Sequence, residues 1–594
     1  MSGQGDDVVN GRVEKEKSNV VETVVKTAVS ELGSSNISTD DESAQLEEVK
    51  LFEKLADPTK LAFCSLTAVV LRLDFGEEWN KEWRQHTLKL VFAHFQLPQK
   101  AFSSVSAYLS GGAHIDDDVF PFIITIKNDS YLQENGRLLL AADLVTIFVR
   151  TGIYDSRYRV LLKHLCALLS VAWDDIEDCE RSVVHILDAQ QSPHVETDEE
   201  EKARKKKERN KKIRRYIMIG AGGAVGGVLV GLTGGLAAPI FAAGVGVLAG
   251  SAAAAGIATT AGAAVLGSLF GVAGAGLAGY KMKRRVGAME EFTIETLAPR
   301  ERALHLALAV SGWISEERED SFRWAWRHLN VSSEQYCLRY ESVYLLQLGK
   351  AMDYLMSFAV SYAVQQTLME TALAGLVSAV TWPMSILMVA NVVDNPWSVC
   401  VRRSVEVGQH LAYVLSTRQQ GNRPVTLMGF SLGARVIFHC LIEMSKDWKR
   451  SAGIIEDVIL LGAPVAGSPK EWQQISRVIG GRIINGYSKT DWMLNFLYRT
   501  MNVQFSIAGT GPVQTGDPKV VNVNLTHIVK GQAEYQHKLT EVLRAVGVNM
   551  KPHSVDSFQD FTLLTKSTSN ASSEGASSAG SGSRADNGSV DVEK

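Results

Sequence analysis

The sequence predicts a mixed α/β protein in which an α-helical region and a Gly/Ala-rich transmembrane hairpin precede a domain built on a mostly parallel sheet. Three observations lead to this prediction. Apolar residues recur at helical spacing through 51–190, a block of 65 residues at 216–280 has no charged side chain, and from Ala303 onward buried strands alternate with helices. The chain of 594 residues is also too long for one compact domain, since a domain holds about 100–200 residues.

The composition excludes several classes of protein. Hydrophobic residues make up 46% of the chain and charged residues 21%, so the protein is not disordered throughout. A net charge of −4 and a pI near 6.4 exclude a dedicated nucleic-acid binder, whose surface would be basic. The six cysteines show no metal-binding spacing, so we expect no metal and no other cofactor, and we expect reduced cysteines in regions that face the cytosol.

The two ends of the chain differ from the helical region. Residues 1–50 carry eleven acidic and five basic side chains, and 567–594 are rich in Ser and Gly, so we expect both segments to be disordered. In 51–190, by contrast, apolar residues recur at i, i+3, i+4 and i+7, as in LAFCSLTAVVLRL. This region shows no catalytic constellation, and we expect it to be a scaffold for a protein partner.

A basic linker leads into the uncharged block. Within the linker 191–215, the stretch 201–215 has ten basic and two acidic side chains, which is typical of a solvated helix face or a coiled coil. The block 216–280 holds 18 glycines and ends at the basic cluster 281–285. A membrane span needs about 20 apolar residues, so the block accommodates two spans and a turn, which we place within 239–260. Basic clusters flank the block at both ends, and such clusters favour the cytosolic side of a membrane. We therefore expect both ends of the block in the cytosol, which requires an even number of crossings.

Small residues recur at a fixed spacing within this block. Glycines four residues apart allow close contact between helices and predict a tight hairpin or a homo-oligomer. A flexible Gly/Ala-rich linker is the alternative, which the absence of charge between two basic clusters disfavours. The spaced glycines are Gly223, Gly227, Gly231 and Gly235, then Gly246 and Gly250, then Gly267 and Gly271.

The basic stretch 201–215 would also attract anionic membrane lipid. Together with the even number of crossings, the sequence predicts a multi-pass protein of the endomembrane system (ER or Golgi) with both soluble regions in the cytosol.

The region 296–550 has the alternation of an α/β domain. Short apolar runs bounded by turn formers are separated by helical segments, which is the pattern of a parallel sheet. We expect strands within 304–313, 334–340, 423–430, 457–465, 481–494 and 518–531.

The third of these strands runs into the motif Gly429-Phe430-Ser431-Leu432-Gly433 and then directly into a helix. This is G-x-S-x-G in the strand–turn–helix context of a nucleophile elbow, and it predicts the α/β-hydrolase fold. Side chains at the flanks of so sharp a turn would collide, which explains Gly429 and Gly433. Ser431 is then a strained, accessible nucleophile at the positive end of the following helix.

The other members of a catalytic triad should follow in the order acid, then histidine. Asp491 stands at the end of the strand in 481–494, where the acid belongs, although an Asp in this place can also cap the next helix. His527 follows the last strand and is our first choice for the base, and His537 in the next helix is the second.

An oxyanion hole requires two backbone N–H groups beside the nucleophile. Leu432, the residue after Ser431, supplies the first. The second is expected in the loop after an early strand, and we assign it to Gly312 or Trp313.

An apolar insertion at 351–397 precedes the elbow. Its segment 371–393 has no charge over 23 residues and is long enough to span a membrane, but one crossing would separate strands that must share a sheet. We expect either a helical lid over the active site or a buried helix pair packed on the sheet. Both leave an apolar approach to Ser431, which favours a lipid or acyl ester as substrate.

Several of these segments resemble the transmembrane and coiled-coil domain-containing protein 4 family. The similar stretches are SGW, RPVTLMGFSLGARVI, LLGAPV and NGYSKTDWML, which follow a Gly/Ala-rich membrane stretch. The resemblance implies an α/β-hydrolase-like membrane protein. The family carries Gly-His-x-x-Tyr near its last strand, whereas this chain has Gln532 in the place of the histidine. A glutamine cannot accept a proton at neutral pH, so Gln532 cannot be a general base.

Two hypotheses about function follow. The first is a membrane-anchored serine hydrolase, similar to a lipase or esterase, that cleaves lipid or acyl esters through Ser431, Asp491 and His527. The alternative is a catalytically reduced protein that keeps the hydrolase fold and acts as a scaffold in membrane trafficking.

Overall fold

The computed structural model describes four parts of the chain: residues 51–111, 118–189, 261–271 and 289–551, the last without 298–301, 317, 366–383 and 502–505, together with Leu277, Tyr280 and Lys281. The predicted segments 1–50, 191–215 and 567–594 lie outside these residues. Most of the predicted hairpin 216–280 lies outside them as well.

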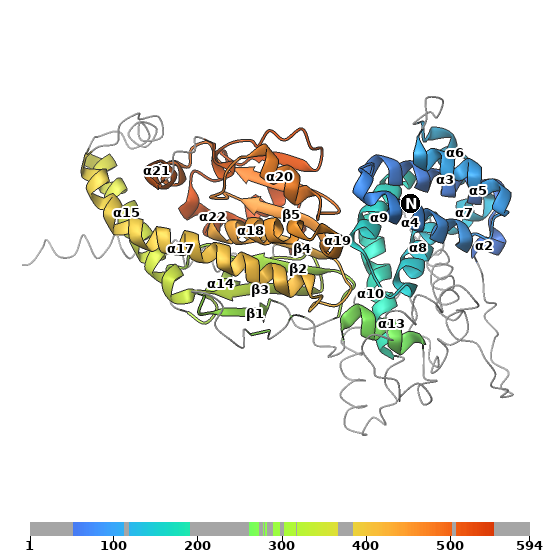
Figure 1. Ribbon diagram of the computed structural model, residues 1–594, viewed down its shortest axis with the longest axis horizontal. Helices are drawn as coiled ribbons and strands as arrows, with labels where there is room; N and C mark the ends of the chain where they lie inside the picture. The colour runs from blue at the N-terminus through green and yellow to red at the C-terminus, as the bar shows by residue number, and fades with distance from the viewer. Residues whose placement is uncertain are drawn as a thin grey trace, which may run out of the picture.

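The predicted helical region is a bundle around its own hydrophobic core (Figure 1). Leu66, Val70 and Phe148 are fully enclosed in this core, as expected from the helical spacing of the apolar residues. Acidic N-caps start two of the helices, since the carboxylates of Asp129 and Asp155 accept backbone N–H groups of the first turns. The helices are α2 (Leu51–Lys54), α3 (Asp57–Asp74), α4 (Lys81–His94), α5 (Gln99–Ser110), α6 (Phe120–Lys127), α7 (Ser130–Asn135), α8 (Leu138–Arg150), α9 (Ser156–Leu169) and α10 (Trp173–Ala189), with a 3₁₀ turn η1 (Glu78–Asn80).

A seven-stranded, mostly parallel sheet forms the centre of the second region, which confirms the predicted α/β class. The order is β1-β3-β2-β4-β5-β6-β7, and only β1 runs antiparallel, against β3. The six predicted strands are present, whereas β1 was not predicted. Every residue of β2, β4, β5 and β6 is buried, because side chains cover both faces of a central parallel strand. The strands are β1 (Phe292–Thr296), β2 (Leu306–Val310), β3 (Glu334–Tyr340), β4 (Val425–Phe430), β5 (Ile455–Leu461), β6 (Ile483–Tyr487) and β7 (Val520–Asn524).

Helices follow most of the strands and cover the sheet (Figure 1). They share one large hydrophobic core with the strands. These elements are α14 (Ser321–Trp324), α15 (Ser342–Gln365), α17 (Met384–Ser416), α18 (Leu432–Lys446), α19 (Trp448–Ser451), α20 (Pro469–Ser476), α21 (Trp492–Met501), the 3₁₀ turn η2 (Ala508–Thr510) and α22 (Gln532–Ala545).

The predicted apolar insertion 351–397 belongs to the two long helices α15 and α17, which pack against each other (Figure 1). Both are anchored by close backbone contacts. A Cβ on Gly349 would lie 2.1 Å from the carbonyl oxygen of Ile314, and one on Gly408 would lie 2.6 Å from that of Val436. The anchored parts of these helices share the core of the sheet, while Tyr354 and Tyr413 are 54% and 61% exposed, so the choice between a lid and a buried helix pair stays a prediction. A lid formed by residues 366–383 would lie outside the described residues.

The last part of the predicted hairpin packs in the protein interior. Helix α13 (Ala261–Phe270) buries Leu266 and Leu269 in the core of the helical region. It also contacts the loop before β4, because a Cβ on Gly421 would lie 1.9 Å from the carbonyl oxygen of Leu269.

Among the described residues, no helix combines the length and the apolar character needed to cross a membrane.

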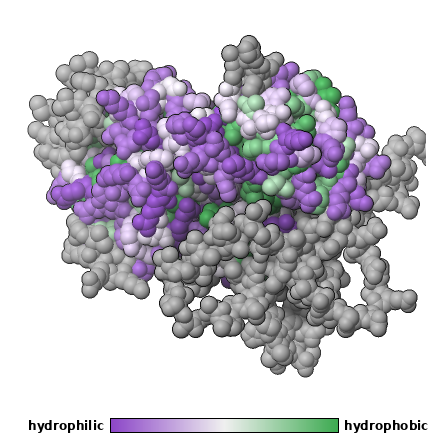
Figure 2. All heavy atoms as spheres, turned by 45° about the vertical axis from the view of Figure 1, so that its right-hand side comes forward, coloured by the Kyte–Doolittle hydropathy of each residue, from purple (hydrophilic) through white to green (hydrophobic). Residues whose placement is uncertain are grey.

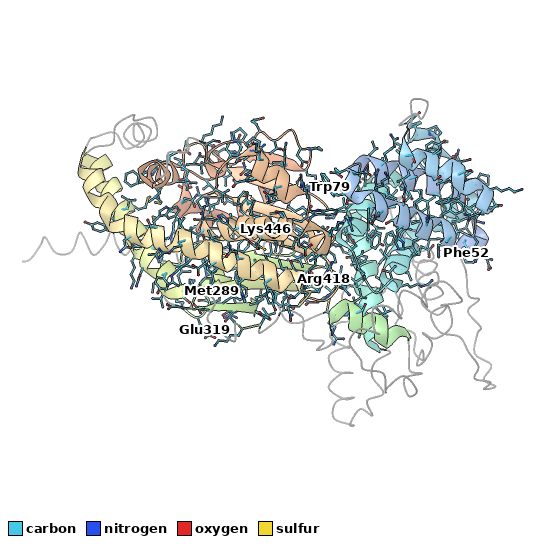
Figure 3. All side chains as sticks on the ribbon, viewed as in Figure 1. Phe52, Trp79, Met289, Glu319, Arg418 and Lys446 are labelled. Atoms are coloured by element: carbon cyan, nitrogen blue, oxygen red, sulfur yellow. The ribbon has the colours of Figure 1, made fainter. Side chains whose placement is uncertain are left out.

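The helical region is attached to the sheet by direct contacts. The N–H of Tyr154 donates to the carbonyl of Asn422 over 2.9 Å, and that of Ser156 donates to the carbonyl of Gly453 over 2.9 Å. Figure 3 shows Trp79 on the side of the helical region that faces the sheet, where the guanidinium carbon of Arg477 lies 5.4 Å from its ring centroid. The two regions thus pack against each other through specific contacts.

Candidate active site

Ser431 occupies the sharp turn between β4 and α18. Its backbone has φ 54° and ψ −129°, a conformation that costs a non-glycine residue about 1–3 kcal/mol. The glycines on both sides are sterically required. A Cβ on Gly429 would lie 2.8 Å from the backbone of Gly433, and one on Gly433 would lie 2.1 Å from the carbonyl oxygen of Val310. The geometry is that of a nucleophile elbow.

The Ser431 side chain is buried and its hydroxyl is unpaired. The residue is 1% exposed, and its Oγ has no hydrogen-bond partner among the described residues. Its backbone N–H donates to the carbonyl of Leu461 at the end of β5 over 2.9 Å, which fixes the turn against the neighbouring strand. The sequence predicted an accessible nucleophile, whereas the structure buries Ser431, because the turn packs against the end of β5.

The residues expected to form the oxyanion hole surround this turn. Leu432 is the first residue of α18, so its N–H is one of those that a helix leaves without an internal partner. Gly312 lies against the nucleophile, since a Cβ there would be 2.8 Å from the Cβ of Ser431. Trp313 is buried beside it. A side chain at 312 would collide with Ser431, so this close approach requires a glycine.

Asp491 lies after β6, fully buried, and its two oxygens have different partners. Oδ1 accepts the N–H of Leu494 over 3.0 Å and so caps α21, which was the alternative role considered for this residue. Oδ2 accepts the side-chain amide of Gln532 over 2.9 Å. Burial raises the pKa of Asp491 to about 7, although both hydrogen bonds oppose this rise.

Gln532, which stands where the resembling family has its histidine, donates to this carboxylate. It is 3% exposed and begins α22. Its Nε2 donates both to Asp491 and to the carbonyl of Gly462, the latter over 2.8 Å, and its Oε1 has no partner among the described residues. In a serine hydrolase the acid receives a ring N–H of the histidine. Here the amide N–H makes that hydrogen bond.

The two candidate bases lie elsewhere. His527 and His537 are both exposed, whereas Ser431 and Asp491 are buried. The ring of His537 makes an edge contact with Trp324 at 6.2 Å. Within the part of the chain that the structure describes, neither histidine is a hydrogen-bond partner of Asp491. The assignment of His527 or His537 as a base therefore stays a prediction without a supporting contact.

Two further residues of this site had weak signals in the sequence. Gly462 turns with φ 53°, and a Cβ there would lie 2.7 Å from the Nε2 of Gln532. Tyr535 is fully buried, and its hydroxyl has no partner among the described residues. A glycine directly after a strand, and the Tyr of the family pattern Gly-x-x-x-Tyr, were the available signals.

Metal ligation has no support in the described residues, where no group of three or more His, Cys, Asp or Glu side chains could hold an ion. The six cysteines are buried and free.

Most of the chain is similar in sequence to known proteins. A family model described as "Protein of unknown function (DUF726)" matches residues 211–549. A Caenorhabditis elegans protein named "Uncharacterized membrane protein F35D11.3" is 53% identical over 516 residues, which are 86% of this chain and 83% of that protein.

Two other relatives carry more specific names. The Oryza sativa subsp. japonica "Transmembrane and coiled-coil domain-containing protein STS1" is 36% identical over 67% of this chain and 61% of its own length. The Saccharomyces cerevisiae "Probable lipase MIL1" is 31% identical over 71% of this chain and 40% of its own length. No solved structure matches the chain.

Proposed function

Because the chain belongs to the family described as protein of unknown function DUF726, and a yeast relative is named a probable lipase, we propose a lipase-like function with reduced catalysis. The protein would be a membrane-associated member of the α/β-hydrolase fold. Its Ser431 site would bind acyl esters of lipids and turn them over slowly or not at all. The observation that carries the proposal is the hydrogen bond from the Gln532 amide to Asp491.

The hydrolase part of the proposal is supported by the position of Ser431. It follows the carboxyl end of a central parallel strand and precedes a helix, with a strained backbone between two obligatory glycines. An acid follows after β6, in the chain order of that fold. Gly312, which comes after β2, lies against the nucleophile.

The low turnover follows from the chemistry of glutamine. A carboxamide can orient against Asp491 as an imidazole does, but it cannot take the proton of Ser431 and return it to the leaving group. Loss of a triad member lowers turnover by about 10⁴–10⁶-fold, and the rest of such a site still accelerates the reaction about 10³–10⁴-fold over water. We therefore expect binding with residual hydrolysis.

Membrane association is supported by the names of two relatives. A contact across the predicted hairpin bears on its topology. Arg159 of the helical region and Glu456 of β5 form a buried ion pair, with Nη1 to Oε2 at 2.8 Å. Residues on both sides of 216–260 therefore belong to one body, and any membrane crossings between them would be even in number. We propose lipid contact through this hairpin, homo-oligomers through its spaced glycines, and the ER or Golgi as the location.

A protein partner for the helical region also stays a proposal. Helix α6 exposes Phe120 and Ile124, which are 64% and 44% accessible, and Leu61 of α3 is 38% accessible. Figure 2 shows hydrophobic side chains gathered on the helical region, while hydrophilic ones predominate on the other coloured surface of this view.

The test measures binding and hydrolysis of a long-chain acyl ester by the full chain, with Ser431→Ala as the matched variant. We expect both proteins to bind the ester and to hydrolyse it at the same low rate. Residues of a triad act as a unit, so the loss of a second member from a site that already lacks one changes little.

Two results would overturn the proposal. Hydrolysis that falls at least 100-fold in Ser431→Ala would mean a complete catalytic system, and loss of the same activity in His527→Ala would identify His527 as its base. Absence of ester binding by the folded wild type would reject an acyl-binding site at Ser431.

A further inference from the structure

Strand β7 (Val520–Asn524) is an edge of the sheet, and among the described residues only β6 pairs with it. The N–H of Ile483 donates to the carbonyl of Lys519 over 2.8 Å, and the N–H of Leu525 donates to the carbonyl of Tyr487 over 2.8 Å. Backbone groups alternate in direction along a strand. The odd-numbered residues of β7 therefore point their backbone groups toward β6, and the even-numbered residues point theirs away from the sheet.

Most of these outward backbone groups are unpaired. The N–H of Val520 donates to the carbonyl of Asp517 over 3.1 Å, in the turn before the strand. Within the part of the chain that the structure describes, the carbonyl of Val520 and both backbone groups of Asn522 and Asn524 form no hydrogen bond. An open edge of this kind is a template for pairing with another strand.

The opposite edge of the sheet is covered. The outward N–H of Ile294 in β1 donates to the carbonyl of Tyr280 over 2.9 Å, and Lys281 forms an antiparallel bridge with Thr293. Strand β7 also lacks charged residues and proline, with which proteins commonly protect an exposed edge, since its sequence is VVNVN. The two edges therefore differ, and β7 is the one suited to pairing.

The outer side of β7 is complementary to itself. In an antiparallel pair centred on Asn522, this residue would lie opposite its own copy, and Val520 would lie opposite Asn524 of the second copy. All three residues point their backbone groups outward, so these are hydrogen-bonded positions. The N–H groups of Asn522 and Asn524 would donate to the carbonyls of Asn522 and Val520 of the second copy, and the reverse follows from the two-fold symmetry.

The side chains between these positions also match. In the same register Val521 would lie opposite Val523 of the second copy, at a position where side chains are closest. Val521 is 37% exposed and Val523 is half-buried, so pairing would remove apolar surface from water. No charged side chains would face each other along the paired strands.

The charges beyond the two ends of β7 favour the antiparallel arrangement. Before the strand, Asp517 accepts the N–H of Lys519 with Oδ1 over 2.9 Å, while the ammonium of Lys519 lies 3.5 Å from Glu77 of the helical region. Beside the other end, Lys489 is exposed, and its N–H donates to Oγ1 of Thr526 over 3.0 Å. Antiparallel pairing brings the amino end of one β7 next to the carboxyl end of the other, so Asp517 would approach Lys489 of the second copy.

We propose that β7 pairs with β7 of a second copy of this chain across a two-fold axis at Asn522. The two sheets then join edge to edge through a short antiparallel junction. A second copy fits better than a strand of another protein, because β7 itself supplies the donors, acceptors and apolar side chains of both halves. This dimer depends neither on the spaced glycines of the hairpin nor on chemistry at Ser431.

The first experiment measures the mass of the purified full chain in a mild detergent over a series of protein concentrations. We expect a dimer, and Val521→Lys should weaken it at least tenfold because two new ammonium groups would repel each other across the junction. Val343→Lys, at a 63% exposed valine of α15, should leave the dimer unchanged. A monomeric wild type would overturn the proposal. A dimer that is equally stable in both variants would also overturn it, because another surface would then hold the copies together.

The second experiment tests the backbone pairing. Asn524→Pro removes only an outward N–H from the strand, a change that an edge strand tolerates. Asn524→Ala keeps this N–H and loses the same side-chain hydrogen bonds to Thr526. The dimer should be at least fivefold weaker in Asn524→Pro than in Asn524→Ala, and equal dimers would overturn the strand pairing.

A crosslink keeps the proposal testable if Asn524→Pro lowers the thermal unfolding midpoint. In the proposed register residue 521 and its copy lie diagonally across the junction, about 7–8 Å apart. A short bismaleimide should therefore crosslink Val521→Cys into a dimer, whereas Val343→Cys should stay uncrosslinked. The six native cysteines are buried, so the new thiol is the accessible one among the described residues. A Val521→Cys protein that gives no more crosslinked dimer than Val343→Cys would overturn the register.

Discussion

Replacement of Gln532 by histidine should turn this site into a working hydrolase. The amide Nε2 of Gln532 already donates to Asp491 over 2.9 Å, and the residue is held at the start of α22. An imidazole at 532 would donate one ring N–H to the same carboxylate, and we expect its second nitrogen to reach Ser431. Asp491 would then orient the ring and stabilise its protonated form.

The size of the gain can be worked from this geometry. A complete base is worth about 10⁴–10⁶-fold in turnover. Histidine Nδ1 is one bond nearer the backbone than glutamine Nε2, so the ring must shift by about 1 Å to keep the hydrogen bond with Asp491. A misplacement of this size costs about 100-fold. We therefore expect Gln532→His to gain about 10²–10⁴-fold, which corresponds to about 3–5 kcal/mol of transition-state stabilisation.

The assay is hydrolysis of an acyl ester as a function of pH, together with labelling of Ser431 by a fluorophosphonate. Gln532→His should hydrolyse faster as pH rises through the histidine pKa, because only the neutral ring accepts a proton. The gain should vanish in the double variant Ser431→Ala/Gln532→His. Gln532→Ala is the matched control. A folded Gln532→His protein with the rate of Gln532→Ala would refute the reasoning that residue 532 stands in the position of the base.

Three further outcomes follow from the geometry. Gly433→Ala should lower the unfolding free energy by more than about 3 kcal/mol in denaturant unfolding, because the new Cβ would overlap the carbonyl oxygen of Val310. Gly511→Ala is the control. Its new Cβ would meet open space, so it should change the unfolding free energy by less than about 1 kcal/mol. The folded state binds a proton at Asp491 more tightly than the unfolded state, since its pKa is raised to about 7. The unfolding free energy should therefore fall by up to about 4 kcal/mol as pH rises from 4 to 7. Asp491→Asn should remove this pH-dependent part, and an Asp491→Asn protein with the pH profile of the wild type would count against the prediction. Arg159→Met should cost about 3–5 kcal/mol of unfolding free energy, because two buried carboxylates, Glu180 and Glu456, lose the guanidinium they share and Glu456 keeps only Lys163 as a cationic partner of its carboxylate. Glu456→Gln in the same chain should recover part of that loss, and no recovery would argue against a charge effect at Glu456.

The sequence predicted the central part of the fold because its signals are local. Buried strands such as β4 and β5 are continuous apolar runs, and the elbow at Ser431 needs glycines at fixed positions. Strand β1 was missed because it is short, half-exposed and begins before the boundary predicted at 296. The packing of α13 was also missed, since an uncharged Gly/Ala-rich helix can fit a protein interior as well as a membrane.

Part of the site was also predictable, because its sequence signals are local. Ser431 and Gly312 follow strand ends, which the pattern of the chain locates. The approach of Gln532 to Asp491 depends on how two loops meet at the sheet edge, and only the family resemblance pointed to position 532.

The ion pair between Arg159 and Glu456 has a consequence for synthesis of the protein. Its two residues are 297 positions apart in the chain. At about 5–20 residues per second, Arg159 leaves the ribosome some 15–60 seconds before its partner is made. During that interval Glu180 is the available partner for its guanidinium, over 2.7 Å. The helical region can therefore fold early around an internal pair, but its surface toward the sheet stays open until β5 has been translated.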